Sequence, residues 1–218
     1  MSKKNGSSTL VDSVYNELKN GIILNEFPPG ASLMPSELKV KFNVSLAVVR
    51  EALTKLLSTG LVTQEPNKGF SVITLSKENF KNIVESRKII ECEALKLSIL
   101  NKTIEWEATI LSLLHQLKNI PEFIEGEKCE PNPKWLEMHK TFHSTLLQRC
   151  NNNILLEFSN NLWTISSVYI SSSIAKNTFK ATPHEHSKMV SFILDNDVEN
   201  AVALYSSHIQ HTFDILFT

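Results

Sequence analysis

Three short helices separated by sharp breaks are predicted between residues 10 and 58, and this spacing restricts the fold more than any other feature of the sequence. Apolar residues three or four positions apart predict a helix over residues 10–24, and Pro28-Pro29-Gly30 then breaks the chain. A second helix is predicted to begin near Pro35. The tight turn Asn43-Val44-Ser45 leads into a third helix that runs to about Ser58, with Ser45 as its N-cap.

A β-hairpin is predicted directly after the third helix. Residues 61–64 and 70–73 are alternating or rich in β-forming residues, and the segment 65–69 supplies the turn between them. Helix, helix, tight turn, helix and hairpin is the order of a winged helix-turn-helix, which binds DNA. Another small α+β domain could have the same order, so the order alone leaves both readings open.

From residue 76 onward the sequence is helical throughout. The predicted helices span about 77–101, 104–119, 133–150, 153–175, 183–195 and 198–217. The segment Thr182-Pro183-His184-Glu185 is predicted to form a capping box, with proline at the first helical position. Helices without strands favour an antiparallel all-helical bundle. The expected chain is therefore mainly α, with a flexible tail (1–9), a winged helix-turn-helix (10–75) and a helical domain (76–218).

Composition excludes several classes of protein. The sequence has no uninterrupted apolar stretch of about 18 residues, so no membrane span is expected. The polar N-terminus lacks the apolar core of a signal peptide. Three scattered cysteines, Cys92, Cys129 and Cys150, are typical of reduced thiols and indicate a cytoplasmic protein.

The segment from Val14 to Thr74 resembles the GntR family of transcriptional regulators. The resemblance lies in YNELKNGIILNEFPPGASL, SELKVKFNVSLAVVREALTKLLSTGLV and the wing EPNKGFSV. The rest of the chain is similar to the FCD type of effector domain found in the FadR-like subgroup. That similarity lies in RKIIE at Arg87, in Phe142-His143 with Asn153, in the segment 185–201 and in His208-Ile209. The resemblance implies a ligand-responsive regulator that binds operator DNA and senses a small organic or sugar acid.

A recognition helix presents its N-terminal residues to base edges in the major groove, and a wing approaches the neighbouring groove or backbone. The predicted DNA-binding residues are Ser45, Leu46, Ala47, Val48, Arg50, Lys68 and Gly69. By the resemblance Arg50 contacts DNA; a solvated charge, or an ion pair with Glu37 or Glu51, is the alternative. Relatives usually carry arginine in place of Leu46, so we expect an operator that differs from the common family pattern.

One recognition helix reads few base pairs, so a homodimer on a near-palindromic operator is expected.

Six of the seven histidines lie between positions 139 and 211. His139 and His143 are four residues apart, so both project from one face of the 133–150 helix. His186 and His208 lie at matching distances on either side of the predicted corner at Asn196-Asp197, so an antiparallel hairpin brings them level. If the 133–150 helix packs against this hairpin, the four histidines converge.

FCD domains typically hold a divalent metal with three histidines and an Asp or Asn, so the resemblance implies a metal site at these four histidines. His143, His186 and His208 stand at the family's histidine positions, and His139 stands where the Asp or Asn usually does. An all-nitrogen set favours Zn²⁺, or Ni²⁺, over manganese. The alternative is that each histidine is a surface or capping residue. Arg87 either anchors an effector carboxylate or pairs with Glu91 one helical turn on.

Two other functions are compatible with a histidine cluster. A metal-dependent hydrolase is disfavoured because no HExxH motif occurs and no Ser-His-Asp or Cys-His arrangement stands out, so the chain is not expected to be an enzyme. A structural metal-binding helical protein with weak or degenerate DNA binding remains open, because Leu46 cannot hydrogen-bond a base.

Overall fold

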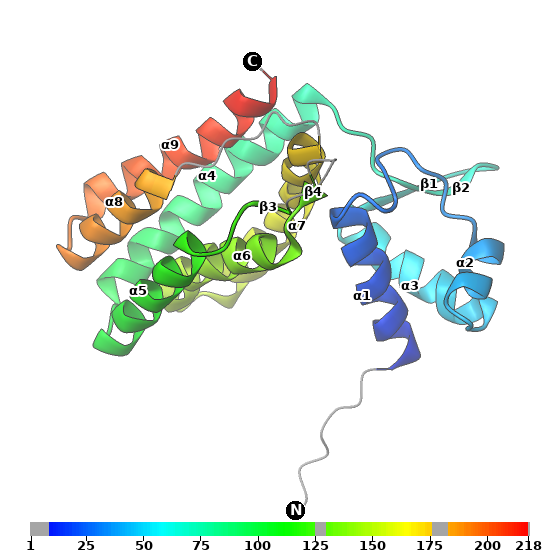
Figure 1. Cartoon of the computed structure of the whole chain (residues 1–218), viewed down its shortest axis with the longest axis horizontal. Coiled ribbons are helices and arrows are strands. Elements are labelled where there is room, and N and C mark those ends of the chain that lie inside the picture. The colour runs from blue at the N-terminus through cyan, green and yellow to red at the C-terminus, as the bar shows by residue number, and fades with distance from the viewer. Residues whose placement is uncertain (1–8, 125–129, 176–182, 218) are drawn as a thin grey trace, which may run out of the picture. The chain divides into compact units, whose positions relative to one another are not determined.

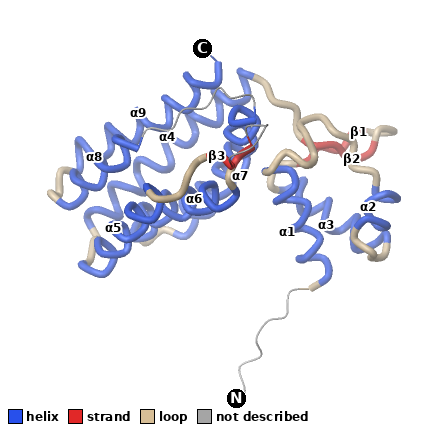
Figure 2. The backbone as a smooth tube through the Cα atoms, viewed as in Figure 1, coloured by secondary structure: helices blue, strands red, loops and turns tan. Residues whose placement is uncertain are grey.

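The computed structural model describes residues 9–124, 130–175 and 183–217, and it is mainly helical, as the sequence predicts (Figures 1 and 2). The chain divides into two compact units, Met1–Leu75 and Ser76–Thr218. None of the described helices is both long and apolar enough to cross a membrane. The predicted capping box at Thr182 and the thiol of Cys129 lie outside the described residues.

The first unit contains three helices and a hairpin in the predicted order. Its elements are α1 (Leu10–Ile23), α2 (Pro35–Lys41), α3 (Leu46–Ser58), β1 (Val62–Glu65) and β2 (Gly69–Val72). Thr9 starts α1 with a capping box, and the Ser45 hydroxyl caps α3 by accepting from the Val48 N–H. Helix α1 packs against α3, and their contact buries Leu18 and Leu53 completely. The unit is a small helical core with a hairpin attached.

Strands β1 and β2 pair antiparallel, from Val62 opposite Val72 to Glu65 opposite Gly69. The connecting turn uses two left-handed residues, Asn67 (φ 64°) and Gly69 (φ 78°). Glycine adopts this conformation without strain, which explains its place at the end of the turn. The outward hairpin tip is therefore fixed by local backbone geometry.

The second unit is a bundle of helices in which α4 packs against α7 and α9, α5 against α6, and α8 against α9 (Figure 1). Its helices are α4 (Lys77–Leu100), α5 (Ile104–Lys118), α6 (Pro133–Leu147), the 3₁₀ turn η1 (Gln148–Cys150), α7 (Asn153–Ala175), α8 (Pro183–Leu194) and α9 (Val198–Phe217). Three of these helices begin with an N-cap side chain that accepts a hydrogen bond from a backbone N–H group of the first turn. The N-cap residues of α4, α5 and α6 are Ser76, Thr103 and Asn132.

Two features of this unit differ from the sequence-based expectation. The α5–α6 connection forms two short paired strands, β3 (Phe123–Ile124) and β4 (Glu130–Pro131), although no strand was expected after residue 76. The connection has no helical period, and its prolines favour extended backbone. Helix α6 ends at Leu147 because the next residues tighten into η1 and Asn151 adopts a left-handed conformation (φ 56°).

Truncation of the α1–α3 core is expected to destabilise the first unit. Leu53 is 0% exposed, so Leu53→Ala should lower the free energy of unfolding by about 2–5 kcal/mol through lost burial and the cavity left behind. Val40→Ala is the matched control, since Val40 is 73% exposed and its change should stay within about 0.5 kcal/mol. Urea denaturation followed by far-ultraviolet circular dichroism measures both. Equal losses of unfolding free energy in the two variants would contradict the packing of α1 against α3.

Candidate metal centre and nucleic-acid interface

The N-terminal half of α3 presents one buried and one exposed face. Val49, Ala52 and Leu53 are buried in the core of the first unit. Exposed on the other face are Ser45, Leu46, Ala47 and Arg50, with Val48 partly exposed. Among the described residues, the Arg50 side chain forms no ion pair with Glu37 or Glu51, and its charge is available to an external partner.

The hairpin tip carries the two wing residues. Lys68 is exposed and its ammonium lies 2.6 Å from the Glu65 carboxylate, an ion pair that solvent screens. A Cβ added at Gly69 would meet no atom within 4 Å, so the constraint at this position is its left-handed backbone and not crowding. The tip can therefore approach a nucleic-acid backbone closely.

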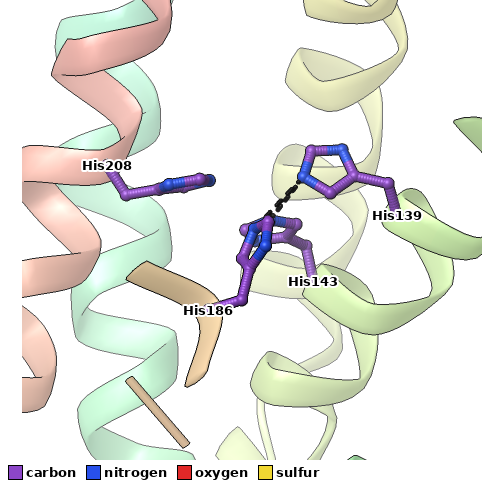
Figure 3. Close-up of side chains that lie close together, drawn as sticks. All are labelled: His139, His143, His186 and His208. Atoms are coloured by element: carbon purple, nitrogen blue, oxygen red, sulfur yellow. Dashed lines mark hydrogen bonds between the residues drawn. The ribbon is translucent and has the colours of Figure 1, made fainter. Parts of the chain in front are cut away.

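Four buried histidines converge in the second unit (Figure 3). Helix α6 supplies His139 and His143, α8 supplies His186, and α9 supplies His208. Their candidate ligand nitrogens all lie within 4.8 Å of one another. The left-handed Asn196 (φ 59°) turns the chain between α8 and α9, which brings His186 and His208 to the same level.

Three of the ring nitrogens form a tight triangle. The Nε2 atoms are 3.1 Å apart for His139 and His143, 3.2 Å for His143 and His186, and 3.3 Å for His139 and His186. A neutral imidazole nitrogen is either a donor or an acceptor. When three such nitrogens contact one another, the three contacts cannot all join a donor to an acceptor. At least one contact therefore joins two donors or two acceptors. A cation that accepts all three lone pairs removes this conflict.

The triangle has the size that a metal ion requires. With metal–nitrogen bonds of about 2.0–2.1 Å, neighbouring ligand nitrogens lie about 2.8–3.4 Å apart in octahedral or tetrahedral geometry. The observed separations of 3.1–3.3 Å fall in that range. The residues present therefore fit a divalent metal with nitrogen ligands.

Contacts outside the triangle orient the rings. Glu185 Oε2 lies 2.7 Å from His208 Nδ1, and Glu185 Oε1 lies 3.2 Å from His211 Nδ1. With Nδ1 held by a carboxylate, the other nitrogen of His208 is left for the site, an arrangement typical of metal-binding histidines. The His139 ring stacks on Trp135, with centroids 4.6 Å apart. His211 binds Glu185 and lies outside the four-histidine group, and His115 and His184 are exposed, as expected of non-ligands.

Burial keeps three of the clustered imidazoles, those of His139, His143 and His186, neutral. Desolvation, with smaller contributions from nearby histidines, holds the pKa of His139 and His143 well below the usual 6.5. Desolvation followed by His208 lowers the pKa of His186 to about 3. Neutral imidazole is the form that binds metal, so the lone pairs are available at physiological pH.

A cavity of about 330 Å³ adjoins the cluster at His143. Glu91 of α4 and Tyr205 of α9 line it, together with Lys140 of α6 and Trp163 of α7. Sequence analysis missed Lys140, Tyr205 and Glu185 as site residues. Lys140 directly follows His139 and Glu185 directly precedes His186, and this adjacency to a predicted ligand was the only available signal.

Arg87 forms the ion pair with Glu91 that was one of its two predicted roles. Its Nε lies 2.7 Å from Oε1 and its Nη2 lies 3.0 Å from Oε2, and both side chains are buried. The Tyr205 hydroxyl donates to Glu91 Oε2 at 2.8 Å, and the guanidinium lies 4.6 Å from the Trp163 ring centroid. Both Glu91 oxygens are thus satisfied inside the protein.

Comparison with known families assigns both units. Residues 82–211 match the FCD domain, and residues 10–72 match the bacterial regulatory proteins of the gntR family. The uncharacterized HTH-type transcriptional regulator BphR of Paraburkholderia xenovorans (strain LB400) is 27% identical over 209 residues, covering 95% of this chain and 85% of BphR. The HTH-type transcriptional repressor GlaR of Escherichia coli (strain K12) is 26% identical over 204 residues, covering 89% of this chain and 90% of GlaR.

Solved structures share the fold. The chain aligns with E. coli McbR/YncC at a TM-score of 0.75 and 21% identity, covering 97% of this chain and 98% of that one. A putative GntR regulator from Rhodococcus sp. RHA1 gives a TM-score of 0.76 at 20% identity, covering 94% and 97%. An N-terminal helix-turn-helix followed by a helical domain is therefore the architecture of this chain.

Acidification is expected to destabilise the metal-free protein. The pKa of His139, His143 and His186 is lowered in the folded state, whereas the unfolded chain titrates near 6.5. The stability that these groups contribute is therefore complete above pH 6.5 and is lost as the pH falls. At pH 5 the loss reaches up to about 2 kcal/mol for each histidine. Urea denaturation in EDTA across this pH range measures the loss.

Two variants test the origin of this slope. His186→Gln removes one of the three histidines and should make the dependence on pH shallower. His115→Gln changes an exposed histidine and should leave it unchanged. Identical slopes for wild type and His186→Gln would show that this histidine is not held neutral by the fold.

Proposed function

The chain belongs to the GntR family of bacterial transcriptional regulators with an FCD domain, and we propose that a metal and a small acid bound in its helical unit control DNA binding by its winged helix. The family and the named relatives make it a DNA-binding regulator and not an enzyme. The observation that carries the proposal is the convergence of four buried histidines beside a cavity.

Helix α3 enters the major groove and the β1–β2 tip contacts the adjacent backbone. Arg50 suits guanine or phosphate because its planar fork offers paired donors. Leu46 and Ala47 are exposed apolar side chains beside it, and they suit contact with thymine methyl groups. The remaining contacts come from Ser45 and Val48 of α3 and from Lys68 and Gly69 of the wing. Each half-site of the operator is therefore expected to have one guanine or phosphate contacted by Arg50, with A·T pairs beside it.

A homodimer binds a near-palindromic operator. A single α3 reads few base pairs, and two-fold symmetry doubles the recognised length. The two half-sites are expected to lie on the order of one helical turn apart or less.

The four histidines hold the metal, with Zn²⁺ favoured by the all-nitrogen donor set and Ni²⁺ as the second choice. When bound, the ion supplies a Lewis-acidic centre for effector oxygens. The protein holds the imidazoles of His139, His143 and His186 neutral by burial, and Glu185 fixes the ring of His208. The adjoining cavity is at the small end of ligand pockets, which span about 300–1,000 Å³, and it suits a small organic acid.

Loss of the Arg50 side chain is expected to weaken specific DNA binding strongly. Arg50→Ala should lower operator affinity by about tenfold to a hundredfold, since one good base contact contributes about 1–3 kcal/mol. The operator is first selected from genomic fragments by mobility shift and footprinted. Lys118→Ala, which removes an exposed charge from the other unit, is the control. Unchanged footprints with Arg50→Ala would refute the assignment of α3.

Replacement of Leu46 tests the apolar contact. Leu46→Arg should strengthen DNA binding or change the preferred DNA sequence, because it adds at an exposed position a guanidinium group that can hydrogen-bond a base. Selection of fragments by both proteins measures the change. If neither affinity nor preference changes, position 46 does not face the groove.

Metal removal is expected to lower the melting temperature. An ion that binds only the folded state adds about 2.7 kcal/mol at a hundredfold excess over Kd, which corresponds to about 5–10 °C for a chain of this length. EDTA should therefore lower Tm, and Zn²⁺ or Ni²⁺ should restore it. Scanning calorimetry and elemental analysis on the same samples measure shift and metal content.

Substitutions assign this response to the cluster. His143→Ala and His208→Ala should remove most of the shift, and His139→Asp should keep it while changing metal preference. His115→Ala, at an exposed histidine, should respond as wild type. The metal site is refuted if the purified protein contains no metal and its melting curve is the same with and without EDTA.

A further inference from the structure

The cavity beside the histidines lies between one face of α6 and one face of α7. On α6, Lys140, His143 and Ser144 follow the three- and four-residue spacing of a single helix face. Asn160 and Trp163 do the same on α7. The metal-ligand His143 and the ammonium of Lys140 therefore both border one small space.

The charges on the cavity wall are unbalanced. Glu91 contributes a carboxylate, but Arg87 neutralises it through two hydrogen bonds, and Tyr205 donates to it as well. Lys140 is half-buried, and among the described residues its ammonium has no ion-pair partner. Within the described part of the chain, the wall thus carries one net positive charge with no opposite charge paired to it.

A bound divalent ion adds a second positive centre. Imidazoles bind a metal as uncharged ligands, and the Glu185 carboxylate, which lies 2.7 Å from His208 Nδ1, offsets only part of the double charge of such an ion. In a partly enclosed space, uncompensated charges are costly unless an opposite charge pairs with them. One positive centre on the cavity wall at Lys140 and a second beside the cavity at His143 match a ligand with two anionic groups.

We propose that the effector is a small dicarboxylate, with one carboxylate at the histidine site and the other paired with Lys140. This inference rests on the proposed function of the same site. Lys140 suits the second anchor better than Arg87, because Arg87 is buried, is not among the residues that line the cavity, and already pairs with Glu91. The amide of Asn160 and the hydroxyl of Ser144 also line the cavity and suit a hydroxyl group between the two carboxylates.

The test uses matched acids that differ by one carboxylate. Malate is lactate with a second carboxylate, and tartrate is glycerate with a second carboxylate. Calorimetric titration of each acid into the full-length, zinc-loaded protein should show the diacid binding about tenfold tighter or more, the worth of one charge-assisted contact. Lys140→Met should remove that preference, lowering diacid affinity about tenfold while changing monoacid affinity less than about twofold. Lys134→Met, an exposed lysine of α6, should behave as wild type.

Each other outcome overturns the inference. If Lys140→Met weakens the binding of all four acids equally, the lysine has a structural role and the inference fails. A wild-type protein that prefers the monoacids, or binds none of the four at millimolar concentration, refutes the dicarboxylate assignment. Zinc content and operator binding are measured on the same preparations. If both are normal, only this inference fails; if zinc is absent, the proposed metal site fails first.

Discussion

The contact of three imidazole nitrogens is the constraint on which the helical unit depends. His139, His143 and His186 place their Nε2 atoms 3.1–3.3 Å apart, and a triangle of such atoms cannot be satisfied by hydrogen bonds alone. These residues come from α6 and α8, and α9 adds His208, so the site ties together segments that are far apart in the sequence. The packing of α5 on α6 and of α8 on α9 holds the rings in this arrangement.

The ion pair of Arg87 with Glu91 forms the second fixed point of this unit. A buried pair is tolerated when its remaining hydrogen-bonding capacity is used, and Tyr205 and the Trp163 ring meet that need. Arg87 and Glu91 lie on α4, which starts directly after the DNA-binding unit. Helix α7 carries Trp163 at the cavity and Tyr169, whose hydroxyl accepts from the Ser76 N–H at 3.4 Å. The cavity and the first residue of the helical unit are therefore linked through one helix.

Local periodicity predicted most of the fold, because helix boundaries depend on nearby residues and caps. The two histidine pairs were predictable for the same reason, since His139 and His143 share one helix face and His186 and His208 belong to one helical hairpin. Their convergence depended on how α6 packs against that hairpin, which local pattern does not determine. The strands β3 and β4 and the early end of α6 were missed because they depend on a connection without a period. Lys140 was missed because its role depends on how α6 is rotated against α7. For Arg87, spacing allowed both an ion pair and a free anchor, and only packing distinguishes them.

The position of His208 bears on whether a bound ion would be enclosed or open to an effector. A closed tetrahedral site requires all four nitrogens at equal separations of about 3.4 Å. Here three nitrogens form a compact triangle, while Figure 3 shows the ring of His208 standing apart from it. Glu185 holds that ring from behind through Nδ1, which resists its movement toward the other three. An ion held by the three close nitrogens, with the fourth farther away, would keep at least one position for a ligand oxygen. The proposed effector binding requires such an open position, whereas a purely structural site closes its coordination shell.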